Sequence, residues 1–216
     1  MQAPNSLPRP AEGSSALLVP TLLALALAAS SCVNQPGVTM QPSIRGSAVL
    51  VESYEAEISD GTGSLAGDTE YSSVDVGFGV VSTDESGKKL GRAEVVLGVA
   101  EYGDLEALEI SGGGRFYLGD PGQVSPFLSI HSVVTTLDSV LVSDGVTVYD
   151  VDPGVQLGLR LGGGVEYQIN EVLFVDLAAD YTLPLIAAEA TVDGFSTPVE
   201  TELYGLAIRV GVGVTF

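Results

Sequence analysis

The chain has 216 residues, of which 45% are hydrophobic, with 27 Gly, no Trp and a single Cys. Its 28 acidic and 8 basic residues give a formal net charge of −20, which argues against nucleic acid as a partner because such a surface repels phosphate backbones. The mean hydropathy is nevertheless +0.36, so apolar and acidic residues must lie in separate segments. The length suits one domain, and the glycine content argues against a helical one.

The N-terminal segment has the pattern of a secretory signal. Residues 16–29 are apolar apart from Pro20 and Thr21, which is short for a membrane-spanning helix, and a polar leader with Arg9 precedes them. We therefore predict a signal peptide over residues 1–31.

The small residues Ala29-Ser30-Ser31 lead directly into Cys32, the only cysteine. This arrangement resembles a bacterial lipobox, which implies cleavage before Cys32 and acylation of its thiol. Ordinary signal cleavage near Ala26-Leu27-Ala28 is the alternative. Residues 32–42, with two further prolines, are predicted to be a linker.

The last strand shows the most regular alternation. From Tyr204 to Phe216 every second residue is a bulky aliphatic or aromatic, while the other face carries Gly, Ala, Thr and the single cation Arg209. A soluble sheet shows the opposite arrangement. The pattern favours a strand with lipid outside and a crowded polar lumen inside.

Seven further segments alternate in the same way between turn-rich, acidic connections, which predicts one β-barrel over residues 43–216. Segments of this length cross a hydrocarbon core when tilted. The alternation is blurred in the first and fifth strands, where Ala48 and Leu50 compete with Val49 and Val51 for the outward face. The predicted strands are Ser43–Tyr54, Glu70–Val81, Leu90–Glu101, Leu105–Leu118, Val124–Thr135, Gly154–Gln168, Val172–Leu183 and Glu202–Phe216.

Charged residues within these strands fall opposite the apolar stripe. A narrow barrel must pair them, because an isolated charge in a low dielectric is costly, and arginine suits this role because it binds carboxylates in a fixed fork. Carboxylates outnumber arginines in this set, which predicts a net negative lumen, filled by side chains rather than open to solutes. The predicted lumen charges are Asp75, Arg92, Glu94, Glu109, Arg115, Arg160, Glu166, Asp176, Asp180 and Arg209.

The connections alternate between short and long, as expected for an even-stranded barrel with periplasmic turns on one rim and outer loops on the other. In the first turn, Lys88 and Lys89 beside Asp84 indicate an ordinary polar turn. The predicted short connections are 82–89, 119–123 and 169–171, and the long ones are 55–69, 137–153 and 184–201, with a small second outer loop after Glu101.

Two segments and the C-terminus carry a family resemblance. The stretch 155–181, with its Gly-Gly-Gly, resembles the penultimate hairpin of the small barrels related to the OmpA transmembrane domain and OmpX, and 124–127 resembles the start of a strand in that group. Phe216 resembles the terminal aromatic that the barrel assembly machinery reads. The resemblance implies an all-β, antiparallel, up-and-down transmembrane barrel in the bacterial outer membrane, with its lipids as partners and its loops facing the cell exterior.

The pattern favours a structural or interaction role for such a barrel. One alternative is a lipid-anchored soluble β-barrel that binds a small apolar ligand or a protein, with the apolar stripe turned inward. A second is a lipid A-modifying enzyme, since Ser129 and His131 share a face of the fifth strand. No oxyanion element accompanies this pair, so we predict a protein that is not an enzyme and has no cofactor. The partner of the loops cannot be read from the sequence.

The long connections are rich in carboxylates, the ligand type that Ca²⁺ prefers. Their spacing does not match an EF-hand, so we predict a solvated, repulsive surface and no metal site, with weak divalent bridging to lipid head groups left open. The acids concerned are Asp60, Asp68 and Glu70 in one loop and Asp138, Asp144, Asp150 and Asp152 in another.

Overall fold

The computed structural model describes residues 37–59, 64–103, 105–119, 122–138, 140–143, 148–152, 154–192 and 199–216. The predicted signal peptide, Cys32, Asp60 and Asp144 lie outside these ranges. The described residues form strands, and none of them belongs to a helix long and apolar enough to cross a membrane.

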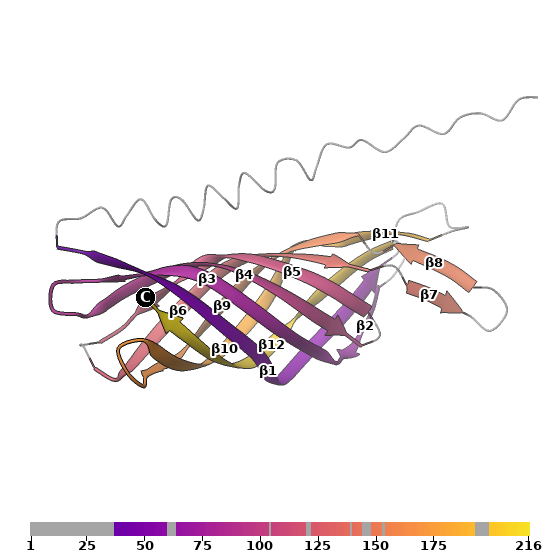
Figure 1. The fold of residues 1–216 in the computed structure, drawn as a ribbon. Helices are drawn as coiled ribbons and strands as arrows, with labels where there is room; N and C mark the ends of the chain where they lie inside the picture. Colours follow the sequence, from indigo (N-terminus) through magenta and orange to yellow (C-terminus); the bar gives the residue numbers. More distant parts are fainter. Residues whose placement is uncertain are drawn as a thin grey trace, which may run out of the picture.

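Eight long antiparallel strands close into a barrel (Figure 1). Each pairs with the next along the chain, and the first and last pair from Ser43 opposite Thr215 to Ser59 opposite Glu200, which closes the sheet. The predicted fold class and strand number are therefore confirmed. The strands are β1 (Thr39–Ser59), β3 (Tyr71–Thr83), β4 (Lys89–Tyr102), β5 (Leu105–Tyr117), β6 (Val124–Leu137), β9 (Val155–Gln168), β10 (Leu173–Ile186) and β12 (Val199–Thr215).

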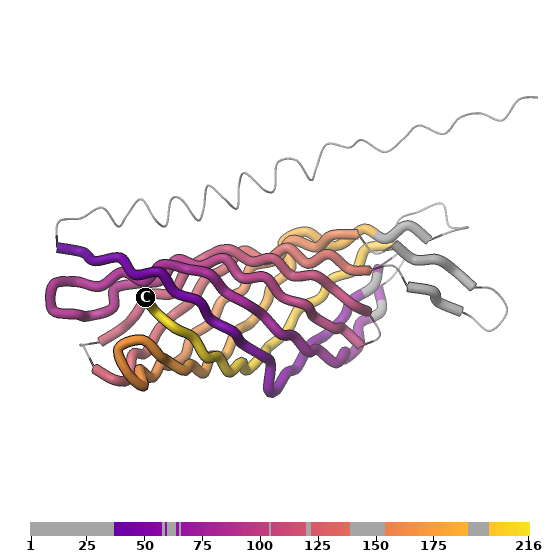
Figure 2. The backbone as a smooth tube through the Cα atoms, viewed as in Figure 1, coloured from indigo at the N-terminus to yellow at the C-terminus, as the bar shows by residue number. Residues whose placement is uncertain are grey.

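One end of the barrel, which we call the turn end, holds the short connections, the start of the first strand and the end of the last strand. The turns lie near Asp84, Gly119 and Asn170, and the start of β1 and Phe216 lie there as well, at the left of Figure 2. The Phe216 backbone N–H donates to the Pro42 carbonyl, 2.9 Å away. The chain therefore enters and leaves the barrel at the same rim.

The opposite end, which we call the loop end, is not made of loops alone. Four short strands extend the sheet beyond the barrel: β2 (Ser64–Thr69), β7 (Val140–Ser143), β8 (Val148–Asp152) and β11 (Ala188–Val192). β2 pairs with the end of β1, β11 pairs with the start of β12, and β8 and β7 follow outward from β11. The long connections thus contain short strands of their own, because β1 and β12 continue past the barrel and offer their edges for pairing.

β1 extends beyond its predicted bounds, Ser43–Tyr54, at both ends, and continues to Ser59. It begins at Thr39, so the last four residues of the predicted linker belong to the barrel. A β-bulge at Leu50 interrupts its pairing with β12, and Leu50 and Val51 both face outward. The bulge exchanges the inward and outward positions along the strand, which explains the blurred alternation at 48–51.

The wall has its aliphatic side outside. Leu206 on β12 is 42% exposed, whereas Arg209 on the same strand is 3% exposed. This is opposite to the inward apolar stripe that the soluble alternative requires. The outer face of the barrel is suited to hydrocarbon and the inner face to charge.

The β3–β4 turn is held by one carboxylate. Asp84 Oδ1 accepts hydrogen bonds from the Ser86 hydroxyl at 2.6 Å, the Ser86 N–H at 2.9 Å and the Lys88 N–H at 3.0 Å. The Ser86 hydroxyl, together with these backbone donors, holds the pKa of Asp84 below its usual value. Gly87 follows with φ +82°, a conformation that favours glycine.

A close approach of β5 and β6 generates a prediction. A Cβ on Gly113 would lie 2.6 Å from the Cα of His131, its direct partner across the ladder. We expect Gly113→Val to force the two strands apart and to reduce the folded, heat-modifiable fraction on unboiled gels. Gly67→Val in β2 is the matched control, because a Cβ there meets no atom within 4 Å. Equal folded fractions for the two variants would contradict the close approach.

Candidate functional site in the lumen and at the loop end

The lumen at the turn end is organised around Glu166, which is fully buried. Arg92 Nη1 lies 3.0 Å from its carboxylate, the Tyr117 hydroxyl donates to it at 2.8 Å, and Lys89 Nζ donates as well. The guanidinium of Arg92 also stacks 4.3 Å from the ring centroid of Phe174. One carboxylate thus serves two cations and a phenol.

The middle of the lumen contains a second cluster around Glu94. Arg115 Nε donates to Glu94 at 3.1 Å, and His131 Nε2 lies 3.2 Å from the same oxygen. Arg45 lies between Glu94 and Asp176, at 3.7 and 3.5 Å, and Arg115 also approaches Asp176 at 3.4 Å. The two arginines therefore bridge two carboxylates.

The third cluster lies toward the loop end. Arg209 contacts Asp75 at 2.6 Å and Asp180 at 3.2 Å, and Arg160 donates to Glu109 at 2.9 Å. All ten sequence-predicted lumen residues are buried, and each takes part in one of the three clusters. Such pairing is what a low-dielectric interior requires.

Three inward-facing tyrosines, which the sequence did not predict, lie on the loop-end side of these charges. Tyr54 and Tyr71 stack with ring centroids 4.2 Å apart, and Tyr102 packs 4.8 Å from Tyr71. Tyr102 donates to Glu109 at 2.5 Å and Arg209 donates to the Tyr71 hydroxyl at 2.6 Å. Beyond the tyrosines the lumen is filled by apolar residues, namely Ala100, Ala107, Leu137, Ala188, Leu203 and Ala207.

Two cations that were not among the predicted lumen residues also face inward. Arg45 lies on the blurred first strand, and Lys89, predicted to belong to a polar turn, is the first residue of β4 and binds Glu166. The predicted negative excess in the lumen is therefore wrong for the described residues, where six cations meet six carboxylates. The cations are Arg45, Lys89, Arg92, Arg115, Arg160 and Arg209, and the carboxylates are Asp75, Glu94, Glu109, Glu166, Asp176 and Asp180.

The Ser129 and His131 side chains share the inner face of β6, but no hydrogen bond joins them in the described structure. His131 bonds Glu94, and Ser129 Oγ has no hydrogen-bond partner among the described residues. A void of about 30 Å³ beside His131, Arg45 and Arg209 has room for about one water.

The loop end is acidic throughout its described part. No Lys, Arg or His occurs among the described residues there, and carboxylates face each other directly across the ladders. Among the described residues, no group of three or more His, Cys, Asp or Glu side chains is arranged to hold a metal ion. The apposed pairs are Glu101 with Glu106, Glu55 with Asp68, Glu57 with Glu202, and Glu189 with Glu200.

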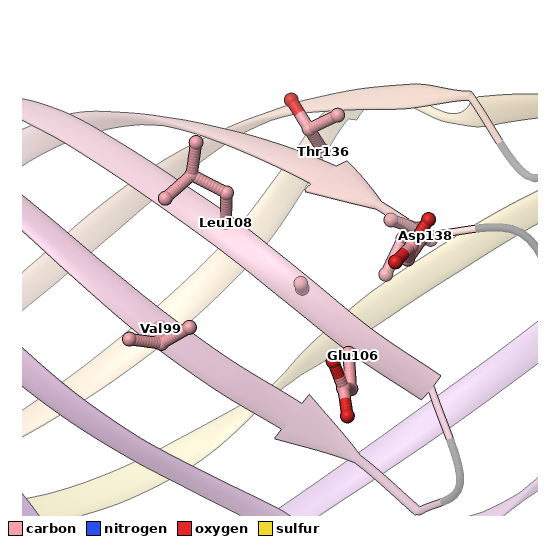
Figure 3. A pocket seen from close by; sticks show the side chains of 7 residues that line it. Val99, Glu106, Leu108, Thr136 and Asp138 are labelled. Carbon is pink, nitrogen blue, oxygen red and sulfur yellow. The ribbon is translucent and has the colours of Figure 1, made fainter.

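The outer wall is hollowed just below this acidic rim (Figure 3). One pocket of about 260 Å³ crosses β4, β5 and β6 and is lined by Val99, Glu106, Leu108 and Thr136. A second, of about 380 Å³, continues toward β3 and β1 and shares Val99 and Glu106 with the first. We call the two together the wall groove.

Comparison with known proteins supports the fold and no closer relationship. No family model and no curated protein matches the chain. The structure is similar to the outer-membrane protein OprG of Pseudomonas aeruginosa, with a TM-score of 0.53 and 15% identity over 82% of this chain and 95% of that one. The chain has the fold of a small bacterial outer-membrane β-barrel.

Two other small barrels are also similar at lower TM-scores. Neisserial surface protein A gives 0.49 with 16% identity over 84% of this chain and 100% of that one. The N-terminal β-barrel domain of Pseudomonas aeruginosa OprF gives 0.46 with 14% identity over 82% of this chain and 100% of that one.

Removing one lumen cation tests the pairing in this outer-membrane barrel fold. We expect Arg209→Met to lower the free energy of unfolding by about 3–5 kcal/mol, because Asp75 and Asp180 would remain buried without their cation. The measurement is urea unfolding of the barrel folded into lipid vesicles. Lys88→Met, in the β3–β4 turn, is the control and should change the free energy by less than about 0.5 kcal/mol. A similar small effect for Arg209→Met would show that the lumen pairs contribute little.

Proposed function

We propose that this protein is a structural outer-membrane barrel that holds an acidic interaction surface at the cell exterior. The observation that carries the proposal is the segregation of charge. The outer wall is aliphatic, the lumen pairs its cations with carboxylates, and the described loop end carries carboxylates without any cation. An acidic surface on a rigid base favours cationic partners and repels anionic ones.

The filled lumen supports a structural role rather than that of a pore. Side chains from all eight barrel strands occupy it, the tyrosine and apolar layer covers its loop end, and the void beside His131 is about 30 Å³. That volume is about the size of one water and is too small for a solute. The lumen then serves to stiffen the cylinder.

The contacts in the lumen also support a non-catalytic role for the protein. A serine nucleophile needs a base within hydrogen-bond reach, whereas His131 bonds Glu94 and Ser129 is buried without a partner in the described structure. Lipid A would have to enter a filled interior to reach either group.

The two rims support a proposed orientation in the membrane. The start of β1 and Phe216 lie at the turn end, which we assign to the periplasm, so that the extended sheet of the loop end faces outward. Outer-membrane barrels keep short turns on the periplasmic side and longer connections outside.

Single introduced cysteines test this orientation in intact cells. We expect Gly67→Cys on β2 to react with a membrane-impermeant maleimide, and Ser86→Cys in the β3–β4 turn to react only after the envelope is ruptured. The wild-type protein, with its one native cysteine, sets the background. Labelling of Ser86→Cys in intact cells, or recovery of the protein without detergent, would overturn the proposed placement.

We also propose that Cys32 is acylated. β1 begins at the turn end only seven residues after Cys32, so an acyl anchor on the periplasmic side is compatible with the barrel. Mass spectrometry of the mature N-terminal peptide should show a lipid-modified Cys32, and Cys32→Ser should lose the lipid mass. An unmodified peptide that begins near Ser30 would instead indicate ordinary signal cleavage.

A further inference from the structure

The wall groove lies where the apolar wall meets the acidic rim. Its floor is apolar and outward-facing: Val74 is 63% exposed, Val99 66% and Leu108 50%. Figure 3 shows Val99, Leu108 and Thr136 along three adjacent strands, with Glu106 and Asp138 nearer the loop end. A ligand that fills this groove must be apolar at one end and meet carboxylates at the other.

On the side of β1, the groove lies beside an interruption of the sheet ladder. The β1–β3 ladder ends where Ala48 pairs with Val74, although β3 continues to Tyr71. Pairing resumes where Tyr54 lies opposite Thr69 on β2, which continues directly into β3, so five residues of β1, 49–53, pass four, 70–73, without a described pairing between them. Backbone groups on the facing edges of such an interruption need water or a polar ligand group, which suits a position at head-group depth.

Two carboxylates border the groove. Glu101 and Glu106 are direct partners across the β4–β5 ladder and both are exposed, so they project from the same face. Like charges placed directly opposite each other destabilise a sheet unless a cation lies between them. The Ser72 hydroxyl donates to Glu101 at 3.4 Å, and the described loop end offers no Lys, Arg or His. A cation that relieves this repulsion would come from outside the chain.

We propose that the wall groove binds a lipid whose head group carries a primary amine. The ammonium donates to Glu101 and Glu106, and one acyl chain lies along Val74, Val99 and Leu108. Charge complementarity decides the occupant, since a second copy of this chain would bring the same carboxylates and an anionic head group would be repelled. The inference rests on the proposed placement in the outer membrane and adds a specific lipid to it.

The test compares two lipids that differ only in the head-group nitrogen. The full-length mature protein is reconstituted in nanodiscs that contain equal amounts of phosphatidylethanolamine and phosphatidylcholine with identical acyl chains, and the lipids retained after gentle detergent extraction are counted by native mass spectrometry. The trimethylated nitrogen of choline cannot donate a hydrogen bond. We expect the wild-type barrel to retain the ethanolamine lipid about three- to tenfold over the choline lipid, as two exposed ion pairs allow.

Paired variants isolate the two carboxylates. Glu101→Gln/Glu106→Gln should retain the two lipids equally. Glu189→Gln/Glu200→Gln should keep the wild-type preference, because this second apposed pair lies on β11 and β12, away from the groove. Each variant is first checked for the heat-modifiable folded band. If the double variant does not fold, Glu106→Gln alone is measured and should show a partial loss.

Three outcomes would overturn the proposal. The first is equal retention by the wild type, and the second is an unchanged preference in the Glu101→Gln/Glu106→Gln variant. The third, measured in parallel nanodiscs that also contain phosphatidylglycerol, is a preference for this lipid that appears with Ca²⁺ and disappears with a chelator. The last would show that the carboxylates bind a divalent cation. Correct maleimide labelling combined with any of these results would leave the outer-membrane placement intact and reject only the lipid site.

Discussion

The pairing of guanidinium and carboxylate groups inside the barrel constrains the rest of the structure. An unpaired ion in this interior would lower the stability by several kcal/mol. The register of each strand must therefore place its charged residues level with their partners on the other strands. A slip of one residue in register would turn an inward strand face outward and place arginines in lipid. The lumen network and the closed sheet with its aliphatic wall therefore depend on one another: neither is stable with the other shifted.

Neutrality inside also explains where the charge of the chain is found. Six of its eight basic residues lie in the lumen beside six carboxylates, and only Arg9 and Lys88 remain. The whole formal charge of −20 therefore lies outside the lumen, and in the described structure most of it is at the loop end. Repulsion there is tolerable because solvent screens it and because the strands beneath are tied together by the lumen. The acidic surface follows from the use of the cations inside.

Strand alternation was sufficient to predict the eight-stranded barrel and ten inward charges, because wall and lumen impose opposite polarity on alternate residues. It failed where the alternation changes phase or a strand depends on a neighbour. Arg45 precedes the Leu50 bulge on the blurred strand, and Tyr54 follows it, so neither could be assigned a face. Lys89 adjoins Lys88 in a segment with turn composition. β2 and β11 exist because β1 and β12 extend beyond the barrel, which local sequence does not show.

The Leu50 bulge connects several of these features. Arg45 on one side of the bulge and Tyr54 on the other both face the lumen. They are an odd number of positions apart, so in a regular strand they would face opposite sides, and the extra residue of the bulge brings both inward. Beyond the bulge, β1 pairs with β2, which continues directly into β3, and so supports the sheet of the loop end. The ladder between β1 and β3 is interrupted just beyond the pair of Ala48 with Val74, next to this bulge. One extra residue thus places side chains in the lumen at two heights and accompanies the irregular part of the wall beside the wall groove.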